Sequence, residues 1–318
     1  MPAAPQEASY YAAILARCFP QIPICDYIII TDGYDSVVLI VNDECVFRFP
    51  RRAAVATQLA REHRLLPELA KTLPIPIPSF EFIWDNPQPY GHPFVGYRKL
   101  AGEPMDIAQL TTAQQVQAAG QLAAFLTALH RFPVARAKEL MGKAHSAASW
   151  RQSLYHLYAD TQEKVIPLLL PDLQQQTIAR WEGFLGNDAN WQFTPRLIHA
   201  DLGPDHILYD AARAKISGII DWGDSEVGDP AMDFSGLLYD YGPSFTATVL
   251  DAYGGELGPA IRQRVQFYAD LLPYRETLYG IYTGDEKHVQ EGISEIAEML
   301  GTRAAHGEPK RQLRSNLF

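Results

Sequence analysis

The sequence predicts an α+β protein of two lobes: a small β-rich N-terminal lobe with one main helix, a hinge, and a larger, mostly helical C-terminal lobe containing a short β-hairpin. Three observations lead to this prediction. β-branched and aromatic runs fill the first hundred positions, long amphipathic patterns follow, and short apolar runs interrupt the helical part between Arg196 and Asp221. At roughly 150 residues per domain, the 318 residues suggest two domains, at 1–99 and 100–318.

Turn residues separate the runs that are expected to form strands in the N-terminal lobe. Asp32-Gly33 and Asn42-Asp43 stand between the first three runs, which favours an antiparallel meander. Pro50 ends the third run, and leucines at helical spacing then predict the main helix. The expected elements are a leading helix, three strands, the main helix and two further strands, over residues 6–19, 27–30, 37–41, 45–49, 53–71, 80–84 and 94–97.

Helical spacing dominates the chain after a short linker at 101–104. The expected helices cover residues 112–131, 147–165, 174–185, 245–253, 261–282 and 285–300. The three apolar runs that interrupt them, at 197–198, 207–209 and 216–220, are bounded by turn residues and predict the strands of the β insert.

Composition excludes several classes of function. The 27 Lys and Arg residues against 37 Asp and Glu residues give a net charge of −10, and so acidic a surface repels phosphate backbones. We therefore expect no nucleic-acid partner. The longest aliphatic run, Val37 to Val41, is far shorter than the ~20 residues of a membrane span, and the N-terminus lacks a signal-peptide pattern. Three cysteines without a C-x-x-C pair argue against a zinc site and favour the cytoplasm.

Three polar residues in the β insert form a constellation suited to phosphoryl transfer. This chemistry needs a carboxylate directed at the acceptor hydroxyl and ligands for a metal that bridges the nucleotide phosphates. Asp201 follows one short strand, His206 lies five residues later, and Asp221 follows another strand. His206 and Asp221 are therefore expected to converge on one metal from two arms of a hairpin. The alternative is that both aspartates are ordinary turn residues.

The same stretch resembles the antibiotic phosphotransferases of the kinase superfamily. The resemblance covers roughly residues 20–300 and is most marked for the aminoglycoside 2″-phosphotransferases, with the macrolide phosphotransferases second. It is carried by His199-Ala-Asp201, Ile219-Ile-Asp-Trp-Gly-Asp224, Gly228-Asp-Pro230, Asp233-Phe234, Phe47-Arg-Phe-Pro50, Leu73 to Pro78, Val95 to Lys99 and Pro273 to Gly280. The macrolide likeness rests on Arg48-Phe-Pro-Arg-Arg52 and Ile220-Asp-Trp222.

The resemblance implies roles for the residues of the insert. Asp201 matches the catalytic base, and Asp221 matches the main metal-binding carboxylate, so Mg²⁺ is the implied metal. His206 stands where most kinases have a metal-binding Asn, although the two antibiotic subfamilies resemble this chain in having His there. His199 matches the first histidine of the motif, which more often braces the loop than carries a proton.

The nucleotide is expected to bind the N-terminal lobe. Arg48 stands where many relatives have a phosphate-contacting Lys, and Glu62 on the main helix faces inward and could pair with it; a solvated strand charge is the alternative. Gly33 and Ser36, in what could be an ordinary hairpin turn, are the expected phosphate neighbours. The segment of Tyr97, Arg98 and Lys99 is expected to meet the purine. A bulky Tyr97 favours GTP over ATP as donor, unless it simply packs under the sheet.

Acidic residues after Asp221 suggest a cationic substrate. The segment from Asp221 to Asp240 has six acids and no Lys or Arg. The expected substrate-binding residues are Asp224, Asp233, Asp240, Asp270 and Tyr274, with Glu276 adding to the acidic character of the late helix. A solvated acidic face would give the same composition, and the tyrosines of the late helix could equally be core residues.

The function these features predict is a Mg²⁺-dependent and GTP- or ATP-dependent O-phosphotransferase acting on an aminoglycoside hydroxyl. The main alternative is a macrolide 2′-phosphotransferase; a metabolic small-molecule kinase and a kinase-like binding protein are less favoured. An apolar pocket around the late helices would favour the macrolide reading, and a carboxylate-lined cleft the aminoglycoside one. The expected protein is a cytoplasmic monomer whose partners are the antibiotic and the nucleotide.

Overall fold

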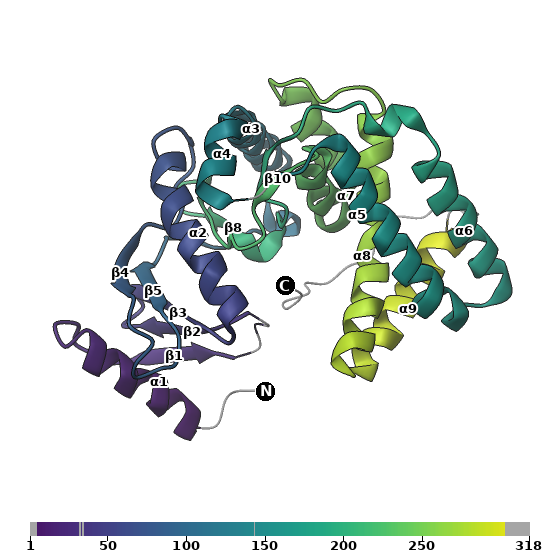
Figure 1. Ribbon diagram of the computed structural model, residues 1–318. Helices are drawn as coiled ribbons and strands as arrows, with labels where there is room; N and C mark the ends of the chain where they lie inside the picture. Colours follow the sequence, from purple (N-terminus) through teal and green to yellow (C-terminus); the bar gives the residue numbers. More distant parts are fainter. Residues whose placement is uncertain (1–4, 32, 34, 143, 303–318) are drawn as a thin grey trace. The chain divides into compact units, whose positions relative to one another are not determined.

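The computed structural model describes residues 5–31, 33, 35–142 and 144–302, and they form two compact units (Figure 1). The first unit contains the described residues up to Gln114 together with Pro204–Asp224. The second contains Gln115–Gly203 and the described residues from Ser225 onward. Within the described ranges, no helix combines the length and the apolar character that a membrane span requires.

A five-stranded antiparallel sheet forms the centre of the first unit, with strand order β1-β2-β3-β5-β4. Its strands are β1 (Tyr27–Ile30), β2 (Ser36–Val41), β3 (Cys45–Pro50), β4 (Phe80–Trp84) and β5 (Phe94–Arg98). Helix α1 (Pro5–Cys18) and helix α2 (Ala53–Leu69) lie on opposite faces of this sheet (Figure 1). The predicted meander, the leading helix and the main helix are therefore confirmed, with bounds within two residues of those expected.

Side chains along β3 point alternately to the two faces of the sheet, which separates its apolar residues from Arg48. Phe47 and Phe49 are fully buried and belong to an apolar core with Leu15 and Phe19 of the α1 region. Arg48 lies between them in sequence and therefore points to the opposite face, the one that α2 covers. The core thus fixes the side of the sheet on which the charged residue lies.

The runs of the β insert divide between the two units: those at 207–209 and 216–220 lie in the first unit, whereas that at 197–198 lies in the second. Strands β8 (Ile207–Asp210) and β9 (Lys215–Ile219) form a hairpin that pairs with β6 (Glu103–Pro104) of the linker. Ile219 N donates to Pro76 O at 3.0 Å, which ties the hairpin to the proline-rich segment. These bonds group the hairpin with the linker and the sheet, while the domains 1–99 and 100–318 stay a prediction.

Helices make up most of the second unit. They are α3 (Thr112–His130), α4 (Val134–Met141), α5 (Ala147–Asp160), α6 (Pro171–Leu185), α7 (Ala231–Ala252), α8 (Ile261–Thr283) and α9 (Glu286–Thr302). Its small sheet pairs β7 (Arg196–Ile198) with β10 (Glu226–Gly228). Short single turns of this unit lie at Thr161–Val165, Ile166–Leu168 and Asp188–Trp191; two more, at Ile107–Gln109 and Pro204–His206, belong to the first unit.

The sequence-based prediction missed the first half of α7. We expected a helix only from residue 245, whereas α7 begins at Ala231. Gly242 has φ 81° and is followed by Pro243, so the chain breaks there and a second helical stretch begins after the break. The expected helix therefore covered only the stretch after the break, and the stretch before it, which includes Asp233 and Asp240, was not predicted as helix. Helix α4 and strand β10 were also missed.

Candidate active site

Three side chains of the first unit form what we call the charge cluster: Arg48, Glu62 and Asp221. Arg48 Nη1 donates to Glu62 Oε2 at 2.8 Å, and Arg48 Nη2 donates to Asp221 Oδ1 at 3.2 Å. The predicted pair between Arg48 and Glu62 is therefore present, and the arginine fork reaches a second carboxylate as well. Glu62 Oε1 is buried and has no hydrogen-bond partner among the described residues.

Burial and charge act against each other in this cluster. Burial raises the pKa of Glu62 to about 7, although the Arg48 guanidinium pulls it back toward its usual value. For Arg48, burial alone would lower the pKa, but the carboxylates of Glu62 and Asp221 outweigh it and raise the pKa above the ordinary value. Arg48 therefore stays charged, and the ionisation of Glu62 is costly.

Asp221 and His206 are neighbours, as the hairpin prediction required. His206 Nε2 lies 3.8 Å from Asp221 Oδ2, and Ile220 N donates to His206 O at 2.9 Å. Asp221 has φ 59°, a left-handed conformation that is unusual for a residue other than glycine and is concentrated at functional sites. Within the described ranges, no group of three or more His, Cys, Asp and Glu residues is arranged to hold a metal.

This donor set fits Mg²⁺ only together with a nucleotide. Mg²⁺ is usually held by one or two carboxylates plus substrate phosphates and water, rather than by a cage of protein ligands. One half-buried carboxylate beside one imidazole is consistent with such shared coordination, although imidazole is a softer ligand than an amide oxygen.

The loop before β2 contains the two expected phosphate neighbours. Ser36 is buried at the start of β2, and its Oγ has no hydrogen-bond partner among the described residues. Gly33 is half-buried beside it, with Ser36 O 3.1 Å from the point where a Cβ on Gly33 would lie. Asp32 and Tyr34, which complete the predicted turn, lie outside the described residues.

The three residues expected at the purine have different environments. Tyr97 is buried, and burial raises the pKa of its hydroxyl to about 12. It points to the same sheet face as Arg48, because its register partner on β3 is Val46. Arg98 contacts Glu44 and Glu81 in exposed ion pairs, and Lys99 pairs with Asp43. Tyr97 therefore has its side chain on the face of the charge cluster, whereas Arg98 and Lys99 are engaged in ion pairs.

In the second unit, Asp201 lies in a loop that buried groups hold by its backbone. Asp233 Oδ1 accepts a hydrogen bond from Ala200 N at 2.7 Å, and Asp233 Oδ2 accepts one from His199 N at 3.1 Å. His130 Nε2 lies 3.0 Å from the same Oδ2. Ala200 has φ 70°, so the loop turns through a left-handed residue just before Asp201.

Helix α7 approaches this loop closely. A Cβ on Gly236 would lie 2.1 Å from Leu202 O, so only glycine permits the approach at this position. Asp240, one turn further along α7, is exposed, and its Oδ2 is 3.1 Å from the point where a Cβ on Gly203 would lie. An exposed carboxylate of α7 is therefore placed next to the loop of Asp201.

Three of the expected substrate-binding residues are buried and bonded to other groups inside their unit, which corrects the prediction. Asp233 is fully buried and accepts the bonds from the loop described above. Asp270 is buried and pairs with Arg180. Tyr274 is buried, and its hydroxyl lies 3.1 Å from Thr177 Oγ1. These side chains face the interior of their unit and cannot present charge or hydroxyl groups at its surface, whereas Asp224 and Asp240 are exposed.

Sequence reasoning also missed the buried partners of Asp229 and Asp233, the acids on either side of the start of α7. Arg264 Nε donates to Asp229 Oδ2 at 2.7 Å, and Tyr268 donates from its hydroxyl to the same oxygen at 2.8 Å. The side chains of Arg264 and Asp229 are both fully buried. His130 is another such residue. His130 and Asp233 are 103 positions apart, so no local spacing could have paired them.

Comparisons with known proteins agree with this geometry. The uncharacterized protein YcbJ of Bacillus subtilis (strain 168) is 24% identical over 278 residues, which are 83% of this chain and 87% of YcbJ. A solved structure of APH(2″)-IIIa with GDP and kanamycin is 31% identical, covers 93% of this chain and 98% of its own, and superposes with a TM-score of 0.83. Macrolide 2′-phosphotransferase type I shares the fold at 23% identity and a TM-score of 0.74, with coverages of 93% and 98%.

A family model spans most of the chain and decides the assignment. The model of the phosphotransferase enzyme family matches residues 26–268, which include the charge cluster, the loop of Asp201 and the beginning of α8. Because this match exceeds half of the chain, the protein belongs to the phosphotransferase enzyme family, with its kinase-like α+β fold.

Proposed function

We propose that this phosphotransferase moves the γ-phosphoryl group of a nucleoside triphosphate, with Mg²⁺, to a hydroxyl of an aminoglycoside. The observation that carries the proposal is the charge cluster, in which one guanidinium joins Glu62 of α2 to Asp221 of the hairpin. A strand cation oriented by a helix carboxylate is the device that kinases use to position nucleotide phosphates. The relative solved with GDP and kanamycin supports both halves of the reaction.

Asp201 is the group that we assign to the acceptor hydroxyl. Its carboxylate would accept the proton of that hydroxyl, or orient it, as transfer proceeds. The loop supports this role, because Asp233 holds the two backbone N–H groups before Asp201 and the side chain of Asp233 is fully buried. A loop fixed in this way keeps the carboxylate directed without paying an ordering cost at each turnover.

Asp221 and His206 are the residues that we assign to Mg²⁺. The ion supplies charge neutralisation for the phosphates when it is bound. Arg48 already bonds to one oxygen of Asp221, Oδ1, while the His206 ring lies nearer the other, Oδ2. Arg48 therefore orients the Asp221 carboxylate through Oδ1, and Oδ2 points toward the His206 imidazole.

Exposed carboxylates favour a substrate with several ammonium groups. Asp240 lies beside the loop of Asp201, and Asp224 is exposed three residues after the metal carboxylate. Charged groups on the substrate would be attracted to such acids, the more so in a protein of net charge −10. Asp233, Asp270 and Tyr274 are buried and are therefore not proposed as substrate contacts. Asp240 and Asp224 are exposed, and we propose them as contacts.

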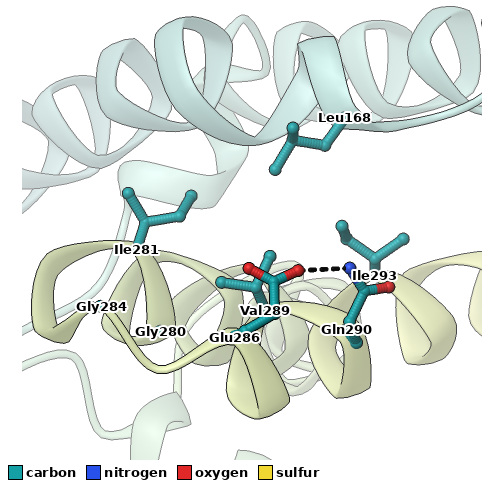
Figure 2. A pocket seen from close by; sticks show the side chains of 8 residues that line it. All are labelled: Leu168, Gly280, Ile281, Gly284, Glu286, Val289, Gln290 and Ile293. Carbon is teal, nitrogen blue, oxygen red and sulfur yellow. Dashed lines mark hydrogen bonds between the residues drawn. The ribbon is translucent and has the colours of Figure 1, made fainter.

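A macrolide substrate is the second candidate, and one observation favours it. A pocket of about 490 Å³ between the end of α8 and α9 has apolar walls from Leu168, Ile281, Val289 and Ile293 (Figure 2). Glu286 and Gln290 close one side through a hydrogen bond of 2.7 Å. An apolar pocket suits a large apolar ligand. None of its lining residues comes from the loop of Asp201 or from α7, so the aminoglycoside proposal is preferred.

We further propose that GTP is the preferred donor and that the protein acts as a cytoplasmic monomer. Tyr97 supports the donor preference because its buried ring stands on the nucleotide-facing side of β5. A large side chain there would narrow the space in which adenine could approach the linker, whereas guanine can pair with backbone groups in a shifted position.

One assay tests the proposed function. Release of nucleoside diphosphate is measured for the purified protein with Mg²⁺ and either GTP or ATP, against a panel of aminoglycosides and macrolides. We expect turnover with an aminoglycoside and GTP, and mass spectrometry should show the antibiotic heavier by one phosphoryl group. Turnover with macrolides alone would replace the proposal by the second candidate. Phosphorylation of no antibiotic in either class would contradict both.

A further inference from the structure

We propose that Arg52 is a further phosphate-binding residue and that Asp35 is its internal competitor, so that nucleotide affinity depends on exchanging the Asp35 carboxylate for a phosphate. This inference rests on the proposed nucleotide-dependent function. Besides Arg48, the first unit would then have a second phosphate-binding cation, Arg52. The nucleotide would have to displace the Asp35 carboxylate from it.

The two side chains form a direct ion pair at the edge of the expected phosphate site. Arg52 Nη2 lies 2.5 Å from Asp35 Oδ1, and the side chains are 40% and 26% exposed. Burial raises the pKa of Asp35, and the Arg52 guanidinium offsets part of that rise. A carboxylate that is costly to bury and is bound to a half-exposed guanidinium can be exchanged for an anion of higher charge.

Hydrogen bonds from Arg51 hold the backbone at Gly33 and Asp35, beside the pair. Arg51 N donates to Asp35 O at 2.9 Å, and Arg51 Nε donates to Gly33 O at 3.0 Å. These bonds tie the loop before β2 to the end of β3. The guanidinium of Arg51 therefore bonds to a backbone carbonyl of the loop. The guanidinium of Arg52, the next residue, bonds to a carboxylate instead.

A buried hydroxyl without a partner points to an anion at the same place. Ser36 is 94% buried, and its Oγ has no hydrogen-bond partner among the described residues. In the register of β2 and β3, Ser36 pairs with Pro50. Arg48 lies two residues before Pro50 in the sequence, and Arg52 lies two residues after it. A phosphate oxygen there would accept from Ser36 Oγ and from a guanidinium, and a buried donor is costly to leave unpaired.

The start of α2 adds to the attraction for an anion. Arg52 is the N-cap residue of this 17-residue helix, which has no side-chain cap and no acidic residue in its first turn. The positive end of the helix dipole is therefore not offset by a local carboxylate of the helix itself. Asp35 supplies the negative charge instead, and its pKa also responds to Asp221 and Arg48, which shows that it shares the field of the charge cluster.

Direct binding measurements test the proposal without relying on turnover. Affinities for guanosine, GDP and GTP, with ATP alongside, are measured by titration calorimetry for the parent, Arg52→Gln, Asp35→Asn and the double variant. Arg64→Gln is the matched control, because it removes the same charge from the same helix about 18 Å further along its axis. Thermal unfolding of each variant confirms that it is folded.

We expect Arg52→Gln to weaken GDP and GTP binding by about tenfold or more, as for loss of a charge-assisted hydrogen bond, with guanosine unchanged. Asp35→Asn should strengthen GTP binding several-fold because the competing carboxylate is gone, and the double variant should lose that gain. Equal nucleotide affinity in Arg52→Gln and Arg64→Gln would overturn the proposal. So would weaker GTP binding in Asp35→Asn, which would make the pair a structural brace. A parent that binds neither GTP nor ATP would instead contradict the proposed function itself.

Discussion

Two groups of charged residues in this protein differ in how completely their hydrogen bonds are satisfied. In the charge cluster, Glu62 Oε1 is buried without a partner, Asp221 is partly exposed, and nearby Ser36 Oγ is unpaired among the described residues. Around Asp229 of the second unit, Arg264, Tyr268 and the backbone N–H of Ala231 all bond to one fully buried carboxylate. The first group has capacity left for a ligand, whereas the second is saturated and holds structure.

An aspartate in an acidic segment can therefore be either a buried brace or an exposed group. Asp224, Asp229, Asp233 and Asp240 lie within 17 positions of the sequence, yet two are exposed and two are fully buried. Buried carboxylates that accept several hydrogen bonds are costly to remove and brace the fold. The exposed carboxylates of Asp224 and Asp240 are the ones that we propose as substrate contacts. Substitutions in the two groups should therefore separate activity from stability.

Asp201→Asn should give the largest loss of activity without loss of stability. The amide cannot accept the proton of the acceptor hydroxyl, and general-base contributions are typically about 10²–10⁴-fold. Single-turnover phosphoryl transfer measures the rate, and the melting temperature should match that of the parent. A rate within about tenfold of the parent would remove Asp201 from this role.

Arg264→Met should give the opposite result, a large loss of stability. It leaves the Asp229 carboxylate buried without its cation, a change that costs about 3–5 kcal/mol. Burial already raises the pKa of Asp229, and loss of Arg264 should raise it further. A raised folded-state pKa means that the deficit is largest at neutral pH and shrinks as the pH falls and Asp229 takes up a proton.

Chemical denaturation at several pH values measures this effect, and Arg262→Met is the matched control. Arg262 pairs with Asp251 at 3.3 Å, but both side chains are well exposed, so its loss should cost no more than about 1 kcal/mol. If the two variants were equally stable, the buried pair would not act as the brace described here.

Glu62→Gln should change how stability depends on pH. The folded-state pKa of Glu62 is raised to about 7, from an ordinary value near 4.5, chiefly by burial. The folded protein therefore holds this proton more tightly than the unfolded chain, and the parent loses stability as the pH rises from about 4.5 to 7. The neutral amide does not titrate, so the parent should lose up to about 3 kcal/mol relative to the variant over that range. Parallel denaturation curves at pH 4.5, 6 and 7.5 measure the difference, and a constant offset would contradict the prediction.

Asp221→Ala should weaken metal binding at the charge cluster. We expect the affinity of the protein for Mn²⁺ with GDP, measured by electron paramagnetic resonance, to fall by about tenfold or more because a charged ligand is lost. His206→Ala should give a smaller loss, since the imidazole is neutral and softer. Asp85→Ala, at an exposed position after β4, is the control. Unchanged Mn²⁺ affinity in both site variants would place the metal elsewhere.

Tyr97→Ala should have the smallest effect, a change in the choice of nucleotide. Removing the buried ring enlarges the space near β5, so kcat/KM for ATP should rise relative to GTP by about tenfold, the scale of a steric filter. Tyr97→Phe keeps the ring and should keep the ratio of the parent. A parent that prefers ATP, or an alanine variant with an unchanged ratio, would show that Tyr97 is a packing residue.

Local pattern predicted much of the fold. Strands 27–30 and 80–84 have the predicted bounds, because β-branched and aromatic runs between turn residues are a strong local signal. The pair between Arg48 and Glu62 was also predictable, since alternation on β3 and helical spacing on α2 each fix a side-chain direction. Helix α7 shows the limit: the prediction covered only the part after the Gly242-Pro243 break.

The sequence alone predicted most of the strands and helices, the meeting of His206 and Asp221 on the hairpin, and the likeness that led to the family. These follow from spacing and turn chemistry over short distances along the chain. Tertiary contacts alone show which acids are buried and which are exposed, and they alone bring Asp35 to Arg52 and His130 to Asp233. The physical reason is that burial and pairing depend on neighbours far away in sequence, and those neighbours set both the cost of a charge and its use.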